Sequence, residues 1–351
     1  MRVLILPVSG GSFPAQAGVL RDHLNNEYKP DVMLSTSGGA VISYLLASAR
    51  FDNEKLTETL GHLNSNLLLR SWWPRPLSFM PSWMIGMFRG FIYQTGDGAK
   101  RFFNTYCSLD NVNNCEIWTG TYNQSLHKAH FFCNIDSEHS VINPRLFKEE
   151  AYSCMPLTYL NYDLEKLIKA VVASASVPTL VPPQIIDSDY YCDGGVLYAS
   201  PLTPMTDVIS QLQDSNGLHL DYVSGFDMDS KAQRTLSPST KNGIIQVGSK
   251  TVSSMINSLC LQDRLNGIKM IYQGHRDQGG TSDIFREEGK VTKENIEEIE
   301  RRRKEYSRSM LELYPSSDFK PLSLTSFNGN DVIFASNEAW KRSQYRFWYV
   351  R

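Results

Sequence analysis

The decapeptide DVMLSTSGGA at residues 31–40 constrains the fold more than any other part of the sequence. A short apolar run of strand length ends there in three hydroxyl residues and two glycines, and residues 40–49 are apolar on nearly every face. A helix that is apolar all round belongs in the interior of a protein. A strand, a glycine turn and a buried helix in this order are typical of parallel α/β folds.

The first 25 residues carry the same arrangement once more. Residues 3–6 form a continuous apolar run, as expected for a strand that is buried on both faces of a parallel sheet. Gly10 and Gly11 then precede a helical stretch at about residues 15–25. Further strands are expected at residues 116–122, 130–135 and 219–225, and further helices at residues 54–70 and 163–173. We therefore expect an α/β fold with a mostly parallel central sheet and helices on both of its faces.

The composition changes along the chain, and we divide it after residue 225. Residues 1–225 hold the α/β pattern, with an apolar segment inserted at residues 72–93. Residues 226–351 are more polar and are predicted to be a more helical extension that packs on the first part. Its strongest element is an amphipathic helix predicted at residues 292–315, with one apolar stripe made of Ile296, Ile299, Tyr306, Met310 and Leu313.

Composition and charge exclude several classes of protein. The formal net charge of -2 gives no general attraction for nucleic acid, so no nucleic-acid partner is expected. The six cysteines are scattered without a Cys-x-x-Cys pair, which indicates reduced thiols and a cytoplasmic location. The apolar run at residues 3–6 is too short for a signal peptide, and no stretch of about 18 apolar residues predicts a spanning helix. Neither a metal nor another cofactor is expected, because no cluster of His or Cys ligands is present.

Ser37 stands where a nucleophile elbow would place its serine, on a sharp turn between a strand and a helix. Ser35 lies two residues before it and Gly39 two residues after it, which gives a G-x-S-x-G pattern with serine in the first position. The start of the next helix brings backbone N–H groups near this serine, where they can stabilise an oxyanion. An ordinary turn between a strand and a helix, without any chemistry, explains the same residues.

Gly10 and Gly11 form a second glycine turn, and their backbone N–H groups could face the same developing oxyanion. Such a turn also suits phosphate or nucleotide binding. However, the sequence contains neither G-x-G-x-x-G nor G-x-x-x-x-G-K-[ST], so the nucleotide interpretation is the weaker one.

A catalytic serine needs a base, and none of the seven histidines lies in a recognisable motif. The alternative base is Asp193, which lies between an apolar stretch and the glycine pair Gly194 and Gly195. A turn of this kind could place the carboxylate against a neighbouring loop, although a lone Asp-Gly-Gly is also a common structural turn.

Together these motifs resemble those of the patatin-like phospholipases, a family of serine lipid acyl hydrolases. Residues 8–12 are similar to the glycine-rich oxyanion loop of the family, and Ser37 matches its G-x-S-x-G nucleophile. Residues 173–178 resemble its Ala-Ser-x-Ala-x-Pro segment, and residues 193–195 match its Asp-Gly-Gly/Ala motif. The four matches occur in the family's order and cover roughly residues 1–205.

The resemblance implies a catalytic domain over residues 1–225 and a phospholipase A-type hydrolase that cleaves fatty-acyl esters of glycerophospholipids. In a Ser-Asp dyad of this kind, Asp193 accepts the Ser37 proton, an acyl-enzyme forms, and water releases the fatty acid. The implied oxyanion hole is built from the backbone of Gly10, Gly11, Ser12 and Gly38. The implied partner is a phospholipid or another acyl-ester lipid, and no metal or cofactor takes part.

Two positions depart from the family pattern. Ser35 replaces the first glycine of the pentapeptide, and Phe13-Pro14 stands where the oxyanion loop usually carries Arg or Lys followed by glycine. Losing one oxyanion donor costs about 3 kcal/mol in the transition state. These departures leave open a weak or inactive relative that binds a lipid or a partner.

A further alternative is an α/β-hydrolase with a Ser-Asp-His triad, in which His219 or His275 would be the base. That fold normally places several strands before its nucleophile, whereas Ser37 follows what we predict to be only the second strand.

The apolar segment at residues 72–93 has two interpretations. Its aromatic side chains are interleaved with arginines, as in a mobile cap that meets a lipid surface. The residues expected to contact lipid are Trp72, Trp73, Trp83 and Phe88. Alternatively, the segment is a helical cover buried over the core, since aromatic and Met clusters usually pack inside. The first interpretation adds peripheral association with a membrane to the expected cytoplasmic location.

Overall fold

A computed structural model describes most of the chain. The described residues are 1–24, 28–65, 70–71, 93–94, 97–142, 156–178, 180–211, 217–229, 244–277, 283–322 and 327–350. Trp72, Trp73, Trp83 and Phe88 lie outside the described residues, so both interpretations of the segment at residues 72–93 stay predictions.

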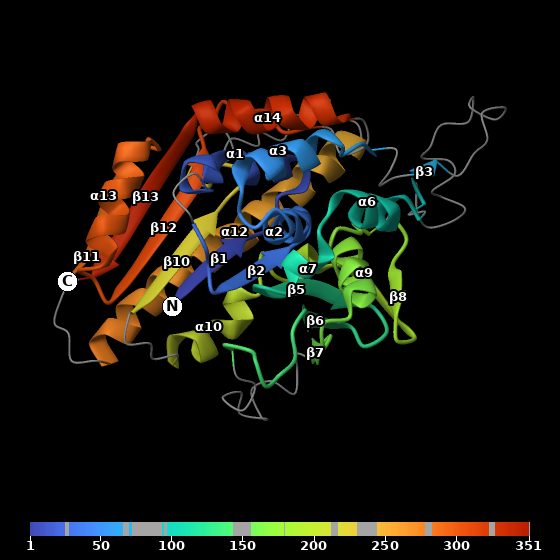
Figure 1. The fold of residues 1–351 in the computed structure, drawn as a ribbon, viewed down its shortest axis with the longest axis horizontal. Helices are drawn as coiled ribbons and strands as arrows, with labels where there is room; N and C mark the ends of the chain where they lie inside the picture. The colour runs from blue at the N-terminus through green and yellow to red at the C-terminus, as the bar shows by residue number, and fades with distance from the viewer. Residues whose placement is uncertain are drawn as a thin grey trace.

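One large mixed sheet forms the centre of the molecule (Figure 1). Its strands are β1 (Arg2–Leu6), β2 (Val32–Thr36), β5 (Glu116–Asn123), β6 (Lys128–Cys133), β7 (Leu157–Tyr159), β8 (Gln184–Ile186), β9 (Asp189–Asp193), β10 (Leu218–Val223), β11 (Ile284–Lys290), β12 (Arg308–Pro315) and β13 (Ser343–Val350). They follow the order β11-β13-β12-β10-β1-β2-β5-β6-β7, and β9 pairs with both β5 and β8. The five central strands β12, β10, β1, β2 and β5 run parallel, and β13 and β6 pair antiparallel with β12 and β5. The edge strand β11 pairs antiparallel with β13. A separate short ladder joins β3 (Arg70–Ser71) to β4 (Tyr93–Gln94).

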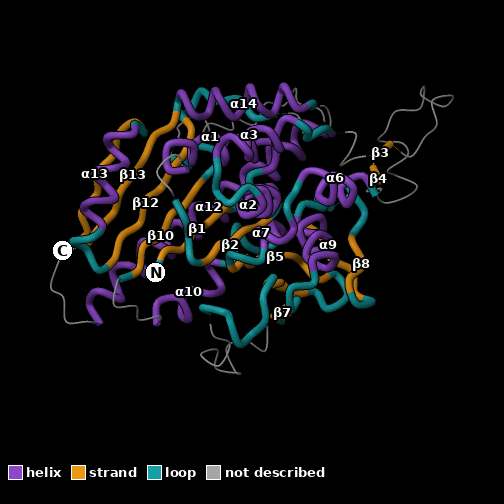
Figure 2. The backbone as a smooth tube through the Cα atoms, in the orientation of Figure 1, coloured by secondary structure: helices purple, strands orange, loops and turns teal. Residues whose placement is uncertain are grey.

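Helices cover both faces of this sheet (Figure 2). They are α1 (Phe13–Leu24), α2 (Gly38–Ser48), α3 (Asn53–Gly61), α6 (Gly98–Tyr106), α7 (Leu109–Val112), α9 (Leu164–Ser174), α10 (Leu202–Gln211), α12 (Ile244–Asp277), α13 (Lys293–Arg303) and α14 (Gly329–Lys341). One apolar core lies between the sheet and α1, α2, α3, α6, α9, α13 and α14. A second apolar core lies between the opposite face and the pair α10 and α12.

This arrangement confirms the predicted fold class. The two strand–turn–helix units expected at the start of the chain are β1 with α1 and β2 with α2, and both strands lie in the parallel part of the sheet. The predicted strands at residues 116–122, 130–135 and 219–225 appear as β5, β6 and β10, and the predicted helix at residues 163–173 appears as α9. The helix predicted at residues 54–70 is shorter in the structure, because α3 ends at Gly61.

The single helix predicted at residues 292–315 is wrong. The helix α13 ends at Arg303, a turn follows, and residues 308–315 form β12 in the middle of the sheet. All eight residues of β12 are buried between β10 and β13, so its sequence needs no alternation of apolar and polar residues. The apolar residues of a fully buried strand can therefore continue the spacing of an amphipathic helix by chance.

The region predicted as a C-terminal extension is closely joined to the rest. It supplies the long helix α12, together with α13 and α14, which agrees with its predicted helical character. It also supplies β11, β12 and β13 to the same sheet, and β12 pairs directly with β10. A division of the chain after residue 225 stays a prediction.

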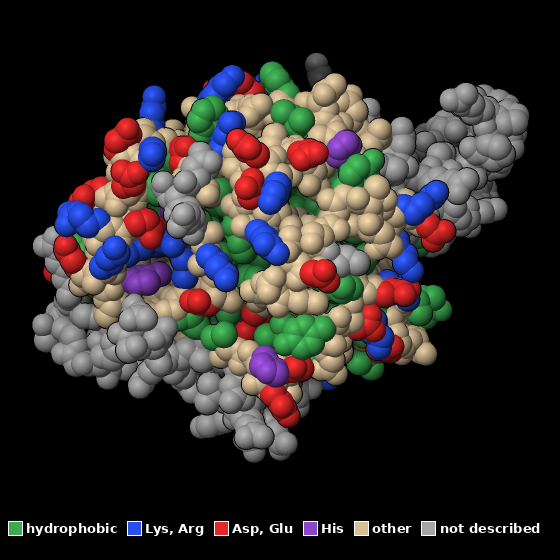
Figure 3. All heavy atoms as spheres, viewed as in Figure 1, with side chains coloured by type: hydrophobic (Ala, Val, Ile, Leu, Met, Phe, Trp, Pro, Cys, Tyr) green, Lys and Arg blue, Asp and Glu red, His purple; other side chains and the backbone are tan. Residues whose placement is uncertain are grey.

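Charged side chains of both signs are mixed on the face of the molecule that Figure 3 draws, and the described cysteines are free. Figure 3 shows acidic and basic side chains interspersed over one face of the molecule, with apolar side chains between them. The five described cysteines are buried free thiols. Among the described helices, none has both the length and the apolar character that crossing a membrane requires.

A buried group of charges ties the sheet to α13. Asp221 on β10 accepts hydrogen bonds from Arg303 Nη2 at 2.6 Å, Arg2 Nε at 2.8 Å and the Tyr28 hydroxyl at 2.7 Å. Burial by itself would raise the pKa of Asp221, but the charges of Arg303 and Arg2 outweigh it and hold the pKa well below the usual range. The carboxylate therefore stays ionised, and removing one arginine would leave a buried charge only partly compensated.

We expect Arg303→Ala to lower the free energy of unfolding by about 3–5 kcal/mol, since it breaks a buried pair from one side. Arg301→Ala is the matched control on the same helix, because the Arg301 side chain is 62% exposed and ion pairs between exposed side chains contribute little to stability. Urea unfolding of both variants measures the difference. Equal losses of unfolding free energy in the two variants would contradict a stabilising role for the buried contact of Arg303 with Asp221.

Candidate active site

The candidate nucleophile stands at a strained turn between β2 and α2. Ser37 has φ 58° and ψ −128°, a backbone conformation that costs a residue with a side chain about 1–3 kcal/mol. The turn can be this tight because Gly39 lies against β1, where a Cβ atom on Gly39 would come within 2.1 Å of Leu6 O. Strain of this kind, at the carboxyl end of a parallel strand, is what a nucleophile elbow requires.

Ser37 and Asp193 contact each other directly. The Ser37 hydroxyl donates a hydrogen bond of 2.6 Å to Asp193 Oδ2, and the Gly195 N–H donates one of 2.7 Å to Asp193 Oδ1. Both side chains are nearly buried, with exposed fractions of 3% for Ser37 and 5% for Asp193. The sequence-predicted pair is therefore brought together from positions 156 residues apart.

The sheet determines where the carboxylate lies. Asp193 is the last residue of β9, where it pairs with Thr121 of β5, and its N–H donates to Ser176 O at 3.0 Å. Gly194 and Gly195 follow at once in the short 3-10 helix η4 (Gly194–Val196). At this strand end, the Gly195 N–H holds one carboxylate oxygen of Asp193, and the other oxygen accepts the hydrogen bond from Ser37.

Burial raises the pKa of Asp193 to about 6, against the opposing effect of the hydrogen bonds from Ser37 and the Gly195 N–H. An aspartate with this pKa is mainly ionised at neutral pH, yet it binds a proton more strongly than an exposed aspartate does. Both properties suit a general base.

Ser174 supports the strained turn from the opposite side. Its hydroxyl oxygen accepts a hydrogen bond of 2.8 Å from the Ser37 N–H and donates one of 2.6 Å to Gly120 O. The predicted Ala-Ser motif at residues 173–178 therefore begins at the end of α9 and reaches the backbone of the candidate nucleophile. The motif was visible in the sequence, but its contact with Ser37 could not be read from it.

The serine that replaces the first glycine of the pentapeptide has its own partner. Ser35 Oγ lies 2.9 Å from Ser43 Oγ and donates to Trp118 O at 3.2 Å. The additional hydroxyl is buried, but its hydrogen bonds are made, so the substitution leaves no unpaired polar group at this turn.

The predicted oxyanion residues divide into two groups. Gly10 and Gly38 line the same pocket as Ser37, and each stands at the beginning of a helical turn, where N–H groups lack an intrahelical acceptor. The Gly11 carbonyl accepts a hydrogen bond of 2.9 Å from the Leu322 N–H, and a role of the Gly11 N–H as an oxyanion donor stays a prediction. The Ser12 N–H donates to Ser9 O at 2.9 Å within the 3-10 turn η1 (Gly10–Ser12), and its role as an oxyanion donor stays a prediction.

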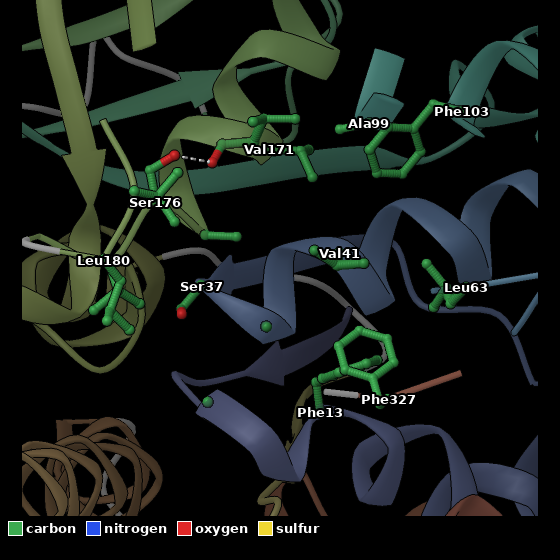
Figure 4. A pocket seen from close by; sticks show the side chains of 16 residues that line it. Phe13, Ser37, Val41, Leu63, Ala99, Phe103, Val171, Ser176, Leu180 and Phe327 are labelled. Atoms are coloured by element: carbon green, nitrogen blue, oxygen red, sulfur yellow. Dashed lines mark hydrogen bonds between the residues drawn. The ribbon is translucent and has the colours of Figure 1, made fainter. Parts of the chain in front are cut away.

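An apolar pocket extends from Ser37 along α2. In Figure 4, Val41 lies one helical turn beyond Ser37, and Leu63 and Phe103 lie farther along the same direction. Side chains of Phe13 and Phe327 form one side of the pocket, and Val171 lies on the other side. Among the described residues that line it, the side chains other than those of Ser37 and Ser176 are apolar. The space beside the hydroxyl therefore suits a hydrocarbon chain better than a polar group.

The structure does not bring the candidate histidine His219 to Ser37. His219 lies opposite Arg2 at the amino end of β1, whereas Ser35 lies opposite Leu6 at the carboxyl end. Four residues of strand separate these levels, which is about 13 Å at about 3.3 Å per residue. The His219 ring instead contacts Ser309 Oγ at 2.9 Å, so a triad through His219 is contradicted.

His275 lies on α12, and its side chain is outside the description. No histidine occurs among the described residues that line the pocket at Ser37. Within the described part of the chain, no three His, Cys, Asp or Glu side chains are grouped closely enough to hold a metal ion.

A family model described as patatin-like phospholipase matches residues 9–206, which is more than half of the sequence. No curated protein sequence matches the chain. Among solved structures, the chain is similar to VipD from Legionella pneumophila, with 10% identical residues and a TM-score of 0.39. That similarity covers 97% of this chain but 65% of VipD, so the chain spans less than two thirds of its length.

We expect Ser174→Ala to lower the free energy of unfolding by about 1–3 kcal/mol, because it leaves the buried Ser37 N–H without an acceptor. Ser176→Ala is the matched control in the same motif, since the Ser176 hydroxyl donates to Val172 O in the last turns of α9 rather than to the turn at Ser37. Denaturant unfolding of the two variants provides the comparison. A loss for Ser176→Ala as large as that for Ser174→Ala would rule out a special role for the Ser174 contact.

Proposed function

The chain belongs to the patatin-like phospholipase family, a family of lipid hydrolases, and on this premise we propose a phospholipase A-type hydrolase of glycerophospholipid acyl esters. The observation that carries the proposal is the hydrogen bond of 2.6 Å from Ser37 Oγ to Asp193 Oδ2 beside an apolar pocket. The pocket favours a fatty-acyl chain over a small polar acyl group, because its lining offers contacts to methylene groups.

In the first proposed step, Ser37 Oγ attacks the ester carbonyl carbon while its proton passes to Asp193 Oδ2. The carbonyl oxygen becomes an oxyanion next to the N–H groups of Gly10 and Gly38. When the tetrahedral intermediate collapses, the bond to the lysolipid oxygen breaks, and that oxygen takes the proton from Asp193. The products are a lysolipid and an ester of the fatty acid with Ser37.

In the second step, water attacks the acyl-enzyme and gives a proton to Asp193. The bond between the acyl carbon and Ser37 Oγ then breaks, the proton returns to Oγ, and the fatty acid leaves. Asp193 is therefore the base and then the acid in each half of the reaction, and no histidine is needed.

A carboxylate is a weak base for a serine hydroxyl, so the surroundings must contribute. Burial raises the pKa of Asp193 to about 6, and it also removes the water that would compete for both groups. The short Ser37–Asp193 contact aligns the proton with its acceptor before the substrate arrives. These features support proton transfer within an apolar site.

We expect Ser37→Ala to reduce ester hydrolysis to background and Asp193→Asn to lower kcat/KM by about 10²–10⁴-fold, because each removes one partner of the proton transfer. Asp187→Asn is the control, since Asp187 lies in the turn before β9 and its side chain is 60% exposed. Hydrolysis of a radiolabelled phosphatidylcholine measures the effect, with circular dichroism to verify the fold.

Treatment with an alkyl fluorophosphonate followed by mass spectrometry tests the same assignment independently of the substrate. We expect an adduct on Ser37 that is absent from the Asp193→Asn variant. Folded protein that neither forms this adduct nor hydrolyses esters would overturn the proposal and favour a relative that only binds lipid. Full activity of either dyad variant would exclude the Ser-Asp mechanism.

The activity should rise with pH through about 6, because Asp193 with a pKa of about 6 can accept the Ser37 proton only when it is ionised. Below that pH, kcat/KM for a soluble ester should fall about tenfold for each pH unit. A profile that is flat through this region, or one that falls as pH rises, would contradict Asp193 as the base. A thermal unfolding curve at each pH excludes loss of the fold as the cause.

A further inference from the structure

Part of the chain beyond the family match packs on the candidate oxyanion loop. The Leu322 N–H donates a hydrogen bond of 2.9 Å to Gly11 O, and a Cβ atom on Gly11 would lie 2.1 Å from Leu322 O. Residues 316–322 follow β12, and the match to the family ends at residue 206. The glycine at position 11 is therefore required by a backbone that lies more than 300 residues away in the sequence.

Phe327 contributes a side chain from the same region to the apolar pocket. Its ring meets that of Phe13 edge to face, with 5.8 Å between ring centroids and an interplanar angle of 61°. Both rings line the pocket that contains Ser37, and Figure 4 shows them side by side, on the same side of the pocket near Val41. The two phenylalanines thus form one continuous wall, which we call the Phe13–Phe327 wall.

The backbone of Phe327 is held by Ser65. Its N–H donates to Ser65 Oγ at 3.3 Å, and its carbonyl accepts from the Ser65 N–H at 3.1 Å. Ser65 is 5% exposed and lies two residues after Leu63, which also lines the pocket. With its backbone held in both directions and its ring packed on Phe13, Phe327 presents a rigid apolar surface.

We propose that Phe327 is a specificity-determining residue that restricts the pocket to straight fatty-acyl chains. This inference rests on the proposed function, because it assumes that an acyl chain extends from Ser37 along α2. A chain that passes Val41 must run beside the Phe13–Phe327 wall, where a straight chain makes close contacts with both rings. A methyl branch at that depth meets the rings, and a packed aromatic pair cannot give way without losing its own contact.

The test compares esters of equal carbon count. The probes are p-nitrophenyl palmitate and an isomer with a methyl branch in the middle of its acyl chain, with p-nitrophenyl acetate as a probe too short to pass Val41. In Phe327→Ala, we expect the preference for the straight chain over the branched isomer to fall about tenfold or more, mainly through KM. We also expect the decrease in kcat/KM for p-nitrophenyl palmitate to exceed the decrease for p-nitrophenyl acetate by a similar factor.

Phe327→Leu should keep most of the preference, because leucine fills much of the same space and this variant is expected to fold. The matched control is Phe334→Ala on α14, since Phe334 is 67% exposed and should leave all three rates unchanged. An unchanged preference in Phe327→Ala would overturn the proposal. Parallel losses on acetate and palmitate would overturn it too, because they would indicate that Phe327 only supports the fold.

A binding measurement separates this inference from the proposed function. In Ser37→Ala protein, displacement of a fluorescent fatty acid by palmitic acid and by its branched isomer reports the pocket without hydrolysis. If wild-type protein hydrolyses no ester, the proposed function fails, and a preference for palmitic acid that Phe327→Ala removes would still support the wall. Equal affinity for the two fatty acids, before and after the substitution, would overturn the inference alone.

Discussion

The rest of the candidate site depends on the pairing of β5 with two different strands. Its first residues run parallel to β2, where Thr36 lies opposite Gly120, and its last residues run antiparallel to β9, where Thr121 lies opposite Asp193. The strand that presents Ser37 and the strand that presents Asp193 therefore end beside consecutive residues of one strand. Backbone pairing places the two side chains together, and their hydrogen bond adds the final alignment.

The electrostatics of the site is a balance of opposing effects. Burial favours the protonated carboxyl of Asp193, whereas the Ser37 hydroxyl and the Gly195 N–H favour the carboxylate. If burial acted without these hydrogen bonds, the carboxyl would remain protonated at higher pH and would be a poor acceptor. If the side chain were exposed, it would be ionised but too weakly basic to draw a proton from serine. The two hydrogen bonds keep the pKa near 6, between these extremes.

Local features of the sequence predicted much of this arrangement. The two glycine turns and the buried helix after Ser37 are short-range patterns, so they identified the start of the sheet and the strained turn. Periodicity failed at residues 308–315, because a strand buried on both faces has no polar side to distinguish it from a helix. The contacts of Leu322 with Gly11 and of Phe327 with Phe13 depend on how distant segments return to the sheet. No spacing within the sequence could reveal them.

The two departures from the family pattern illustrate the difference between contacts that are local in the sequence and contacts between distant segments. Ser35 meets Ser43, eight residues later on the helix that follows, so a local reading could have found the partner of the additional hydroxyl. Phe13 meets Phe327, which lies outside the region matched by the family, and its role in the pocket is apparent only when both are placed. A missing basic residue weakens the case for catalysis when only the loop is considered. In the folded chain, Phe13 fills this position, packs against Phe327 and lines the apolar pocket. Its apolar character therefore suits a lipid substrate.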